Sequence, residues 1–263
     1  MKYILICYLF SVLSIGQASA ENLMIFIQCG NEELSYHAEL KQAMSDINVE
    51  MLDYVIDWDK TIEEHALGID SIINCYRENV DSLNLFLLSN QEASFVAFDV
   101  LSQDTNIVAL ITLSGNFCNG DDYLYNEISI RKQVEMLDSQ SSDGRKELYL
   151  ETAYNIIASA KRGKKLVLPE NADNEMQNLY NFLHSRYGRS LLAFSLEEHL
   201  EKIHSWVMPF YRSANQSDEL DLNIGRFLYL GAQFGIKLTC PDVYNDQSAK
   251  SEVSELVVKF LKK

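Results

Sequence analysis

A polar break between two apolar runs, near residue 90, has the outline of a turn that holds a nucleophile. Leu85–Leu88 form a short apolar run typical of a buried strand, and a helical pattern follows over Ala93–Leu101. A strained strand–turn–helix break of this kind raises the serine of a Gly-x-Ser-x-Gly motif above a sheet. Here Gln91 stands in the serine position, and Ser89 and Ala93 stand in the glycine positions. Because glutamine has no hydroxyl oxygen that a base can activate, the sequence predicts the turn without its nucleophile.

The elements that must position this turn alternate between strands and helices. Continuous apolar runs predict strands, and apolar residues at helical spacing predict helices. In chain order these are a strand at Leu23–Ile27, a helix at Glu33–Asp46, a strand at Met51–Ile56, a helix at Thr61–Glu78, the strand and helix around residue 90, and a strand at Ile107–Leu113. This order indicates an α/β fold, with a mostly parallel sheet covered by helices on both faces. Functional groups lie at the carboxyl ends of such strands, which makes Gln28, Asp57, Gln91 and Gly115 candidates.

The second half of the chain is mostly helical by its pattern. We interpret Tyr123–Trp206, which is rich in charge, as a helical cap inserted into the core. After the cap the predicted elements are a loop at Met208–Asp221, a last strand at Phe227–Leu230 and an amphipathic helix at Ser251–Lys263. The expected domains are therefore a first core part at 21–122, a cap at 123–206 and a second core part at 207–263.

The first 20 residues have the pattern of a signal peptide. Lys2 gives a positive start, Tyr3–Ile15 is apolar, and Ala18-Ser19-Ala20 is a small-residue cleavage site. The apolar run is short for a membrane-spanning helix, although a retained N-terminal anchor is the alternative. We expect cleavage after Ala20 and a secreted or periplasmic protein. No later segment is apolar enough to span a membrane.

The charge of the chain restricts its partners. The formal net charge is −16, and loss of Lys2 with the signal peptide makes it −17. Such a surface repels phosphate backbones, so we expect no nucleic-acid partner. It suits a basic protein partner or a cationic ligand, while a salt-rich habitat would explain the acidity equally well. No cofactor is predicted.

The cysteines and histidines give no strong sign of a metal site. Four cysteines remain after cleavage, and their wide spacing lacks the zinc-knuckle pattern and leaves three disulfide pairings open: Cys29, Cys75, Cys118 and Cys240. His199 and His204 are five residues apart, whereas a helical metal pair needs four. We expect His37 and His65 to be solvated, and His184 to lie at the end of a helix.

Several segments, taken in order, are similar to those of one known group of proteins. They are FIQCGN at the first strand, LSNQEAS at the turn, LSGNFCNGDDYLYNEI after the fourth strand, WVMPFY after the cap, and FLYLGAQFG near the end. Together they resemble the exported α/β-hydrolases of the prolyl-oligopeptidase-like and dienelactone-hydrolase-like group. LSGNFCNGDDYLYNEI is the most specific part of the resemblance.

The resemblance implies a hydrolase fold that has lost its chemistry. Gln28 and Cys29 take the places of the family's His-Gly turn beside the oxyanion hole, and Glu92 keeps a family glutamate. Gln91 replaces the nucleophile, and Gly235 falls where the family has the aspartate that orients the histidine. The 28 residues after Gly235 contain no histidine. The resemblance thus implies a pseudoenzyme that binds a small molecule, peptide or protein through one group of residues: Gln28, Cys29, Gln91, Glu92 and Gly115.

A different alignment keeps an enzyme. Lys165–Leu168 could then be the acid strand with Asp173 as the acid, and Leu191–Phe194 the last strand with His199 as the base. Ser89 or Ser94 would be the nucleophile. This order of serine, acid and histidine suits the fold, and it predicts an esterase or peptidase with a non-standard triad. Against it, His199 reads as an exposed residue of a charged helix.

Overall fold

The computed structural model describes residues 22–29, 36–80, 82–126, 145–168, 170, 172, 174–212, 217–239, 242–244, 254–255, 257–259 and 261. Strands and helices alternate through the first half of this chain, a group of helices follows, and the remaining strands complete the sheet. The fold class predicted from the sequence is confirmed.

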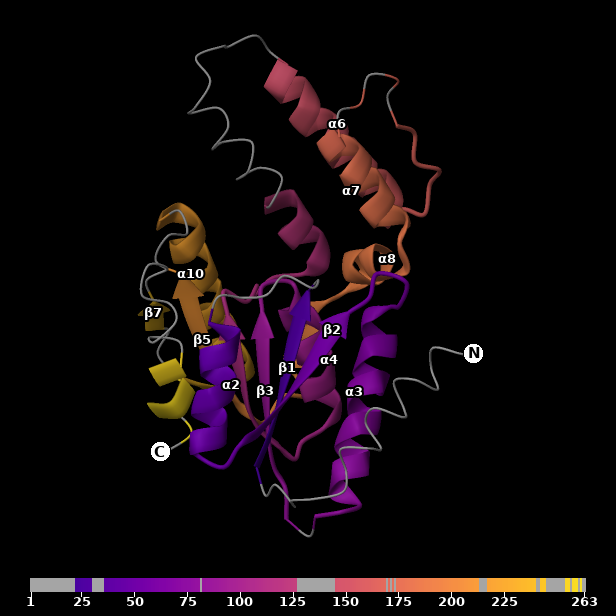
Figure 1. The fold of residues 1–263 in the computed structure, drawn as a ribbon. Coiled ribbons are helices and arrows are strands. Elements are labelled where there is room, and N and C mark those ends of the chain that lie inside the picture. The colour runs from indigo at the N-terminus through magenta and orange to yellow at the C-terminus, as the bar shows by residue number, and fades with distance from the viewer. Residues whose placement is uncertain are drawn as a thin grey trace.

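One parallel sheet contains all the described strands. They are β1 Asn22–Cys29, β2 Glu50–Ile56, β3 Asn84–Asn90, β4 Ile107–Leu113, β5 Trp206–Arg212, β6 Lys237–Leu238 and β7 Asp242–Tyr244. Their order is β2-β1-β3-β4-β5-β6, with β7 paired to β5. Every pair is parallel, so Cys29, Asn90 and Leu113 bring the ends of the central strands to one carboxyl edge (Figure 1).

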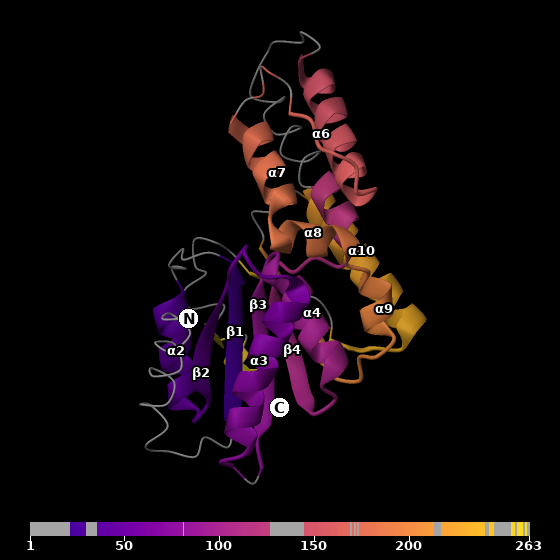
Figure 2. The same cartoon turned by 90° about the vertical axis from the view of Figure 1, so that its right-hand side faces the viewer.

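Helices bury both faces of this sheet. They are α2 His37–Asp46, α3 Ile62–Arg77 and α4 Ala93–Gln103, and Figure 2 shows α3 and α4 side by side. Successive residues of β1 point to opposite faces. Ile25 and Ile27 therefore enter the core formed with α3 and α4, while Met24 and Phe26 enter the core formed with α2. This two-sided burial explains why β1 is a continuous apolar run.

Three cap helices lie beyond the carboxyl edge, and they are α6 Arg145–Lys161, α7 Asn174–His184 and α8 Arg186–Ala193. The fourth, α9 Leu196–Leu200, packs against α4 at the level of the sheet (Figure 2). In Figure 1, α6 and α7 rise above the strand tips and α8 lies between them and the sheet. Residues 120–126 are also helical. The chain thus leaves the sheet after β4 and returns to it at β5.

Strand β5 corrects the predicted loop at Met208–Asp221. Pro209 lies inside this strand, and a proline normally argues against a sheet position because it has no N–H to donate. The outer neighbour of β5 is β6 at Trp206 and Val207, but β7 from Phe210 onward. Pro209 lies between these two pairings, where no outer partner requires a donor.

Helix α10, Ser217–Phe234, corrects the predicted strand at Phe227–Leu230. Phe227 is 1% exposed, while the next two residues, Leu228 and Tyr229, are 50% and 68% exposed. One buried residue per helical turn, rather than every second residue, explains this pattern. Gly235 follows with a φ of 67°, the left-handed conformation that commonly ends a helix.

Two further predicted strands are absent at their expected positions. Residues 164–168, which include Lys165–Leu168, have no regular secondary structure. Leu191 to Ala193 belong to α8, and Phe194 is its C-cap. The described residues of the predicted terminal helix, between 254 and 261, are helical. In the part of the chain that the structure describes, no helix has the length and apolarity needed to cross a bilayer.

Candidate functional site

The turn between β3 and α4 keeps the backbone of a nucleophile elbow. Gln91 has a φ of 41°, a left-handed conformation that is uncommon for a residue with a side chain. Its N–H donates to the Leu113 carbonyl at 2.9 Å, which ties the turn to the end of β4. The Gln91 side chain is exposed, and the next residue, Glu92, is half-buried. The turn therefore presents an exposed amide side chain at a strained backbone position.

Ser94 holds this turn from beneath. Its hydroxyl donates to the Gln91 carbonyl at 2.7 Å and accepts from the Asn116 N–H at 3.2 Å. The side chain is fully buried, at 0% exposed. A buried hydroxyl with both of these partners is a structural brace between the turn and the loop after β4.

The end of β1 lies beside the turn. Gln28 and Cys29 close this strand, and both are half-buried. Burial, and then the negative charge of Glu92, raise the pKa of the Cys29 thiol. Because thiolate is the reactive form of cysteine, this thiol is held in its unreactive form. The influence of Glu92 also shows that Cys29 and the turn share one electrostatic environment.

Gly115 lies in the tightly packed loop after β4. A Cβ atom at this position would come within 2.7 Å of the Thr112 side chain, so the loop requires glycine here. The residue before it, Ser114, has a φ of 55° and donates its N–H to the Phe210 carbonyl. The predicted binding residues Gln28, Cys29, Gln91, Glu92 and Gly115 therefore come from the ends of three neighbouring strands.

Tyr187 of the cap connects the loop after β2 with the turn after β3. Its backbone N–H donates to the Trp58 carbonyl, in the loop after β2, and its hydroxyl donates to the Glu92 carbonyl, both at 3.2 Å. The side chain is 0% exposed, and burial, followed by Cys29 and Glu92, raises the pKa of its hydroxyl. Tyr187 thus fixes α8 over the end of β1.

Nothing in the sequence singles out Tyr187. The nearest signal is Ser185, which caps the start of α8 by accepting from the Gly188 N–H at 2.9 Å. A serine is a common helix N-cap, but it does not show that the tyrosine two residues later reaches the core.

The alternative triad is not assembled among the described residues. Ser89 lies inside β3 at 0% exposed, and its hydroxyl has no hydrogen-bond partner. His199 Nε2 lies 3.0 Å from an oxygen of Asp99, and Nδ1 lies 2.7 Å from the Ser195 carbonyl. Neither ring nitrogen is therefore available to Ser89 or Ser94. Asp173 lies outside the described residues.

His199 and His65 are more buried than predicted. The His199 side chain is 18% exposed, because its ring stacks on Phe194 at 4.3 Å. His65 is 0% exposed, and its ring nitrogens contact the Tyr54 hydroxyl and the Asp57 backbone. Burial lowers the pKa of His65, so its ring is neutral. Both residues were predicted as solvated because glutamates surround them in the sequence.

The other histidines have local partners. His37 Nε2 lies 2.6 Å from an oxygen of Asp53 and is partly exposed. His184 is exposed at the end of α7, as predicted, and contacts the Tyr180 carbonyl. Within the described residues, no group of three or more side chains is arranged to bind a metal ion. Cys29, Cys75 and Cys118 are free thiols, and Cys240 lies outside the described residues.

The far side of the sheet corrects the position assigned to the acid. Gly235 ends a helix, so it does not occupy the end of a strand. The strand that follows the cap is β5, and the segments directly after β5 and β7 lie outside the described residues. The last histidine of the sequence is His204, which precedes β5. The residues given after β5 thus contain no histidine.

Comparison with solved structures identifies the fold. The protein Est1E from Butyrivibrio proteoclasticus matches with a TM-score of 0.53 at 15% identity, over 94% of this chain and 89% of that one. A crystal structure described with the carboxylesterases of Nitrososphaera gargenis matches with a TM-score of 0.55 at 10% identity, over 93% of this chain and 91% of that one. A thermostable carboxyl esterase from Bacillus coagulans gives 0.53 at 14% identity, over 92% and 89%. No protein-family model matches the sequence, and no curated protein matches it. The chain has the α/β-hydrolase fold.

Proposed function

We propose that this α/β-hydrolase-fold protein is non-catalytic and binds a small molecule, peptide or basic protein partner at the carboxyl edge of its sheet, around Gln91. One observation carries the proposal. The residue at the strained, exposed position of the turn is an amide, with a φ of 41°, and an amide is not among the side chains that act as enzymatic nucleophiles. Strain of this kind costs about 1–3 kcal/mol and is commonly kept for a function.

The surrounding groups support a binding role. The hydroxyl of Ser94 is committed to the backbone, the thiol of Cys29 is protonated, and no histidine follows β5. An exposed amide can still donate and accept hydrogen bonds to a ligand. The acidic chain, at −16, favours a basic partner over an anionic one.

An esterase with a non-standard triad is the second candidate, because two of the compared structures are described as carboxylesterases. The two candidates separate by labelling the purified chain with a fluorophosphonate probe and by hydrolysis of aryl esters. We expect neither labelling nor hydrolysis above that of a boiled sample. Labelling that disappears in Ser89→Ala or Ser94→Ala would overturn the non-catalytic proposal.

The variant Gln91→Ser tests how much of the site is missing. It restores a hydroxyl at the turn without a base, and a base contributes about 10²–10⁴-fold to such reactions. We expect ester hydrolysis to stay at background in this variant. Hydrolysis well above background would show that an acid and a base are present after all.

Binding can be tested with two named probes. One structure of Est1E contains ferulic acid, so ferulic acid is the first probe, and a lysine-rich peptide is the second. We expect one of them to shift the amide signals of Gln91 and Glu92 in NMR spectra. The shift should weaken in Gln91→Ala and persist in Gln103→Ala, which changes an exposed glutamine at the other end of α4.

We also propose that the chain is exported, with cleavage after Ala20. The support is the charged, apolar and small-residue pattern of residues 1–20. Mass spectrometry of the protein isolated from its own cells should find Glu21 at the N-terminus. An intact Met1 would contradict cleavage.

A further inference from the structure

Asp99 and His199 form a largely buried pair that has no part in the proposed function. His199 Nδ1 faces the Ser195 carbonyl at 2.7 Å, and Nε2 faces a carboxylate oxygen of Asp99 at 3.0 Å. Both partners are acceptors, while a neutral imidazole has a single N–H. The two contacts are therefore satisfied together when the ring carries both protons.

The surroundings favour this protonated ring. Burial alone would lower the pKa of His199, but the hydrogen bonds to Asp99 and to the Ser195 carbonyl outweigh it and raise the pKa above its ordinary value. Asp99 is the charged residue that α4 directs at the ring, and its side chain is 7% exposed. The other charged residues near the ring in the chain are Glu197, Glu198, Glu201 and Lys202. Asp121 follows the loop whose Gly120 N–H donates to the Phe194 carbonyl.

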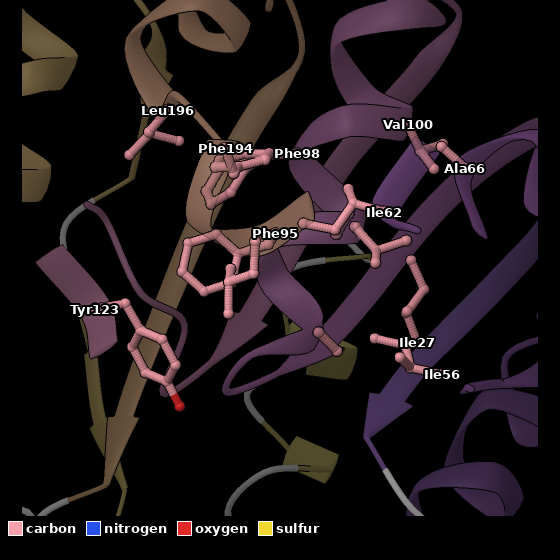
Figure 3. Packing of buried hydrophobic residues seen from close by; sticks show 14 of the residues in the cluster. Ile27, Ile56, Ile62, Ala66, Phe95, Phe98, Val100, Tyr123, Phe194 and Leu196 are labelled. Atoms are coloured by element: carbon pink, nitrogen blue, oxygen red, sulfur yellow. The ribbon is translucent and has the colours of Figure 1, made fainter. Parts of the chain in front are cut away.

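The pair fixes the segment 194–200, through which the chain leaves the cap for β5. Phe194 packs against Phe95 of α4 with ring centroids 5.2 Å apart, and Figure 3 shows it beside Phe98 as well. Its carbonyl accepts from the Gly120 N–H at 3.1 Å, and the Leu196 N–H donates to Asn119 at 2.9 Å. These other contacts of the segment do not titrate near neutral pH, whereas the contact of His199 does.

We propose that Asp99 and His199 form a pH-operated latch, which holds the segment 194–200 on α4 while His199 is protonated and weakens as the proton leaves. The loss of the proton leaves one ring nitrogen with its lone pair facing an acceptor. Because the folded protein binds this proton more tightly than the opened segment does, the stabilisation is complete below the pKa of the opened state. It is lost as the pH rises through the higher pKa of the folded state.

Amide hydrogen exchange of the full chain between pH 5.5 and 9 tests the latch. We expect the protection of residues 196–200, corrected for intrinsic exchange, to fall as the pH rises. The fall should be about tenfold for each unit by which the folded pKa exceeds the opened one. In His199→Gln this fall should disappear, and in the exposed control His204→Gln it should remain.

An NMR titration of the histidine rings completes the test. The ring of His199 should titrate above the ordinary value, and Asp99→Asn, which keeps the shape of the side chain, should lower that pKa. A pKa at or below the ordinary value, or one that Asp99→Asn leaves unchanged, would overturn the latch. Neither result depends on whether Gln91 binds a ligand, so failure of the latch and failure of the proposed function are distinguishable.

Discussion

A serine hydrolase brings a strained turn, an acid and a base to one point, whereas this chain has the turn at the start of α4 and an acid–base pair in its second half. At its start, the turn at Gln91 has the strained backbone and the exposure of a catalytic position, but no nucleophile. In its second half, Asp99 and His199 form a largely buried acid–base pair, which neither Ser89 nor Ser94 contacts. Eight residues separate Gln91 from Asp99, which along a helix corresponds to about 12 Å.

This distance is too long for the acid–base pair to activate a group at the turn. A nucleophile and its base must approach to about 3 Å, so neither end can serve the other. Both ring nitrogens of His199 are engaged in contacts within the protein. The Gln91 side chain, in contrast, is exposed and forms no hydrogen bond with the described residues. One end of α4 is thus used for stability and the other is kept available. Residue types alone do not make a catalytic site, because the backbone must bring them to one point.

The largest expected effect is at the buried end, and Asp99→Ala tests it. This change leaves the His199 ring buried without its charged partner, so we expect a loss of about 3–5 kcal/mol in the free energy of unfolding, measured by urea denaturation. His199→Ala and the double variant complete a cycle in which the double variant loses less than the sum of the single ones. Additive losses would mean that the two side chains do not stabilise each other.

The turn and the sheet were predictable from the sequence, because local pattern determines them. Buried strands such as β1 are continuous apolar runs, and the polar break at Gln91 separates two strongly apolar elements. The structure has a sharp turn between strand and helix at the expected residues, although the sequence could not reveal the φ of 41° at Gln91.

The second half of the sheet was not predictable in the same way. Phe227–Leu230 is apolar enough for a strand, yet Phe227 is buried while Leu228 and Tyr229 are exposed, because α10 shows a single face to the core. Pro209 concealed β5, since the gap between β6 and β7 that accommodates it is a tertiary feature.

Contacts across the chain were equally concealed. Asp99 and His199 are 100 residues apart, and Tyr187 and Glu92 are 95 apart. Nothing in the local pattern pairs such residues. The glutamates beside His199 indicated a solvated helix, and that helix has a buried side as well.

A smaller effect is expected beneath the turn, from Ser94→Ala. The change removes the hydroxyl that accepts from the buried Asn116 N–H at 3.2 Å, so that this N–H loses its partner. We expect a loss of about 1–3 kcal/mol in the free energy of unfolding, measured by urea denaturation. Ser102→Ala is the matched control, because the Ser102 hydroxyl bonds only within α4, to the Asp99 carbonyl, and its loss should cost less. Equal losses would remove the special role of Ser94 as a brace.

The smallest expected effect is a gain in stability at the turn itself, from Gln91→Gly. A side chain at positive φ costs about 1–2 kcal/mol, and glycine removes that cost while losing about 0.5–1 kcal/mol through the greater freedom of the unfolded chain. We therefore expect a gain of up to about 1.5 kcal/mol in the free energy of unfolding, measured by urea denaturation. Gln103→Gly, in the last turn of α4, should instead lose stability, because it relieves no strain. If Gln91→Gly also loses stability, the turn stores no strain. The glutamine at residue 91 would then carry no cost in stability, and strain would no longer support a binding function there. Of the two ends of α4, only the buried pair would still show a clear energetic role.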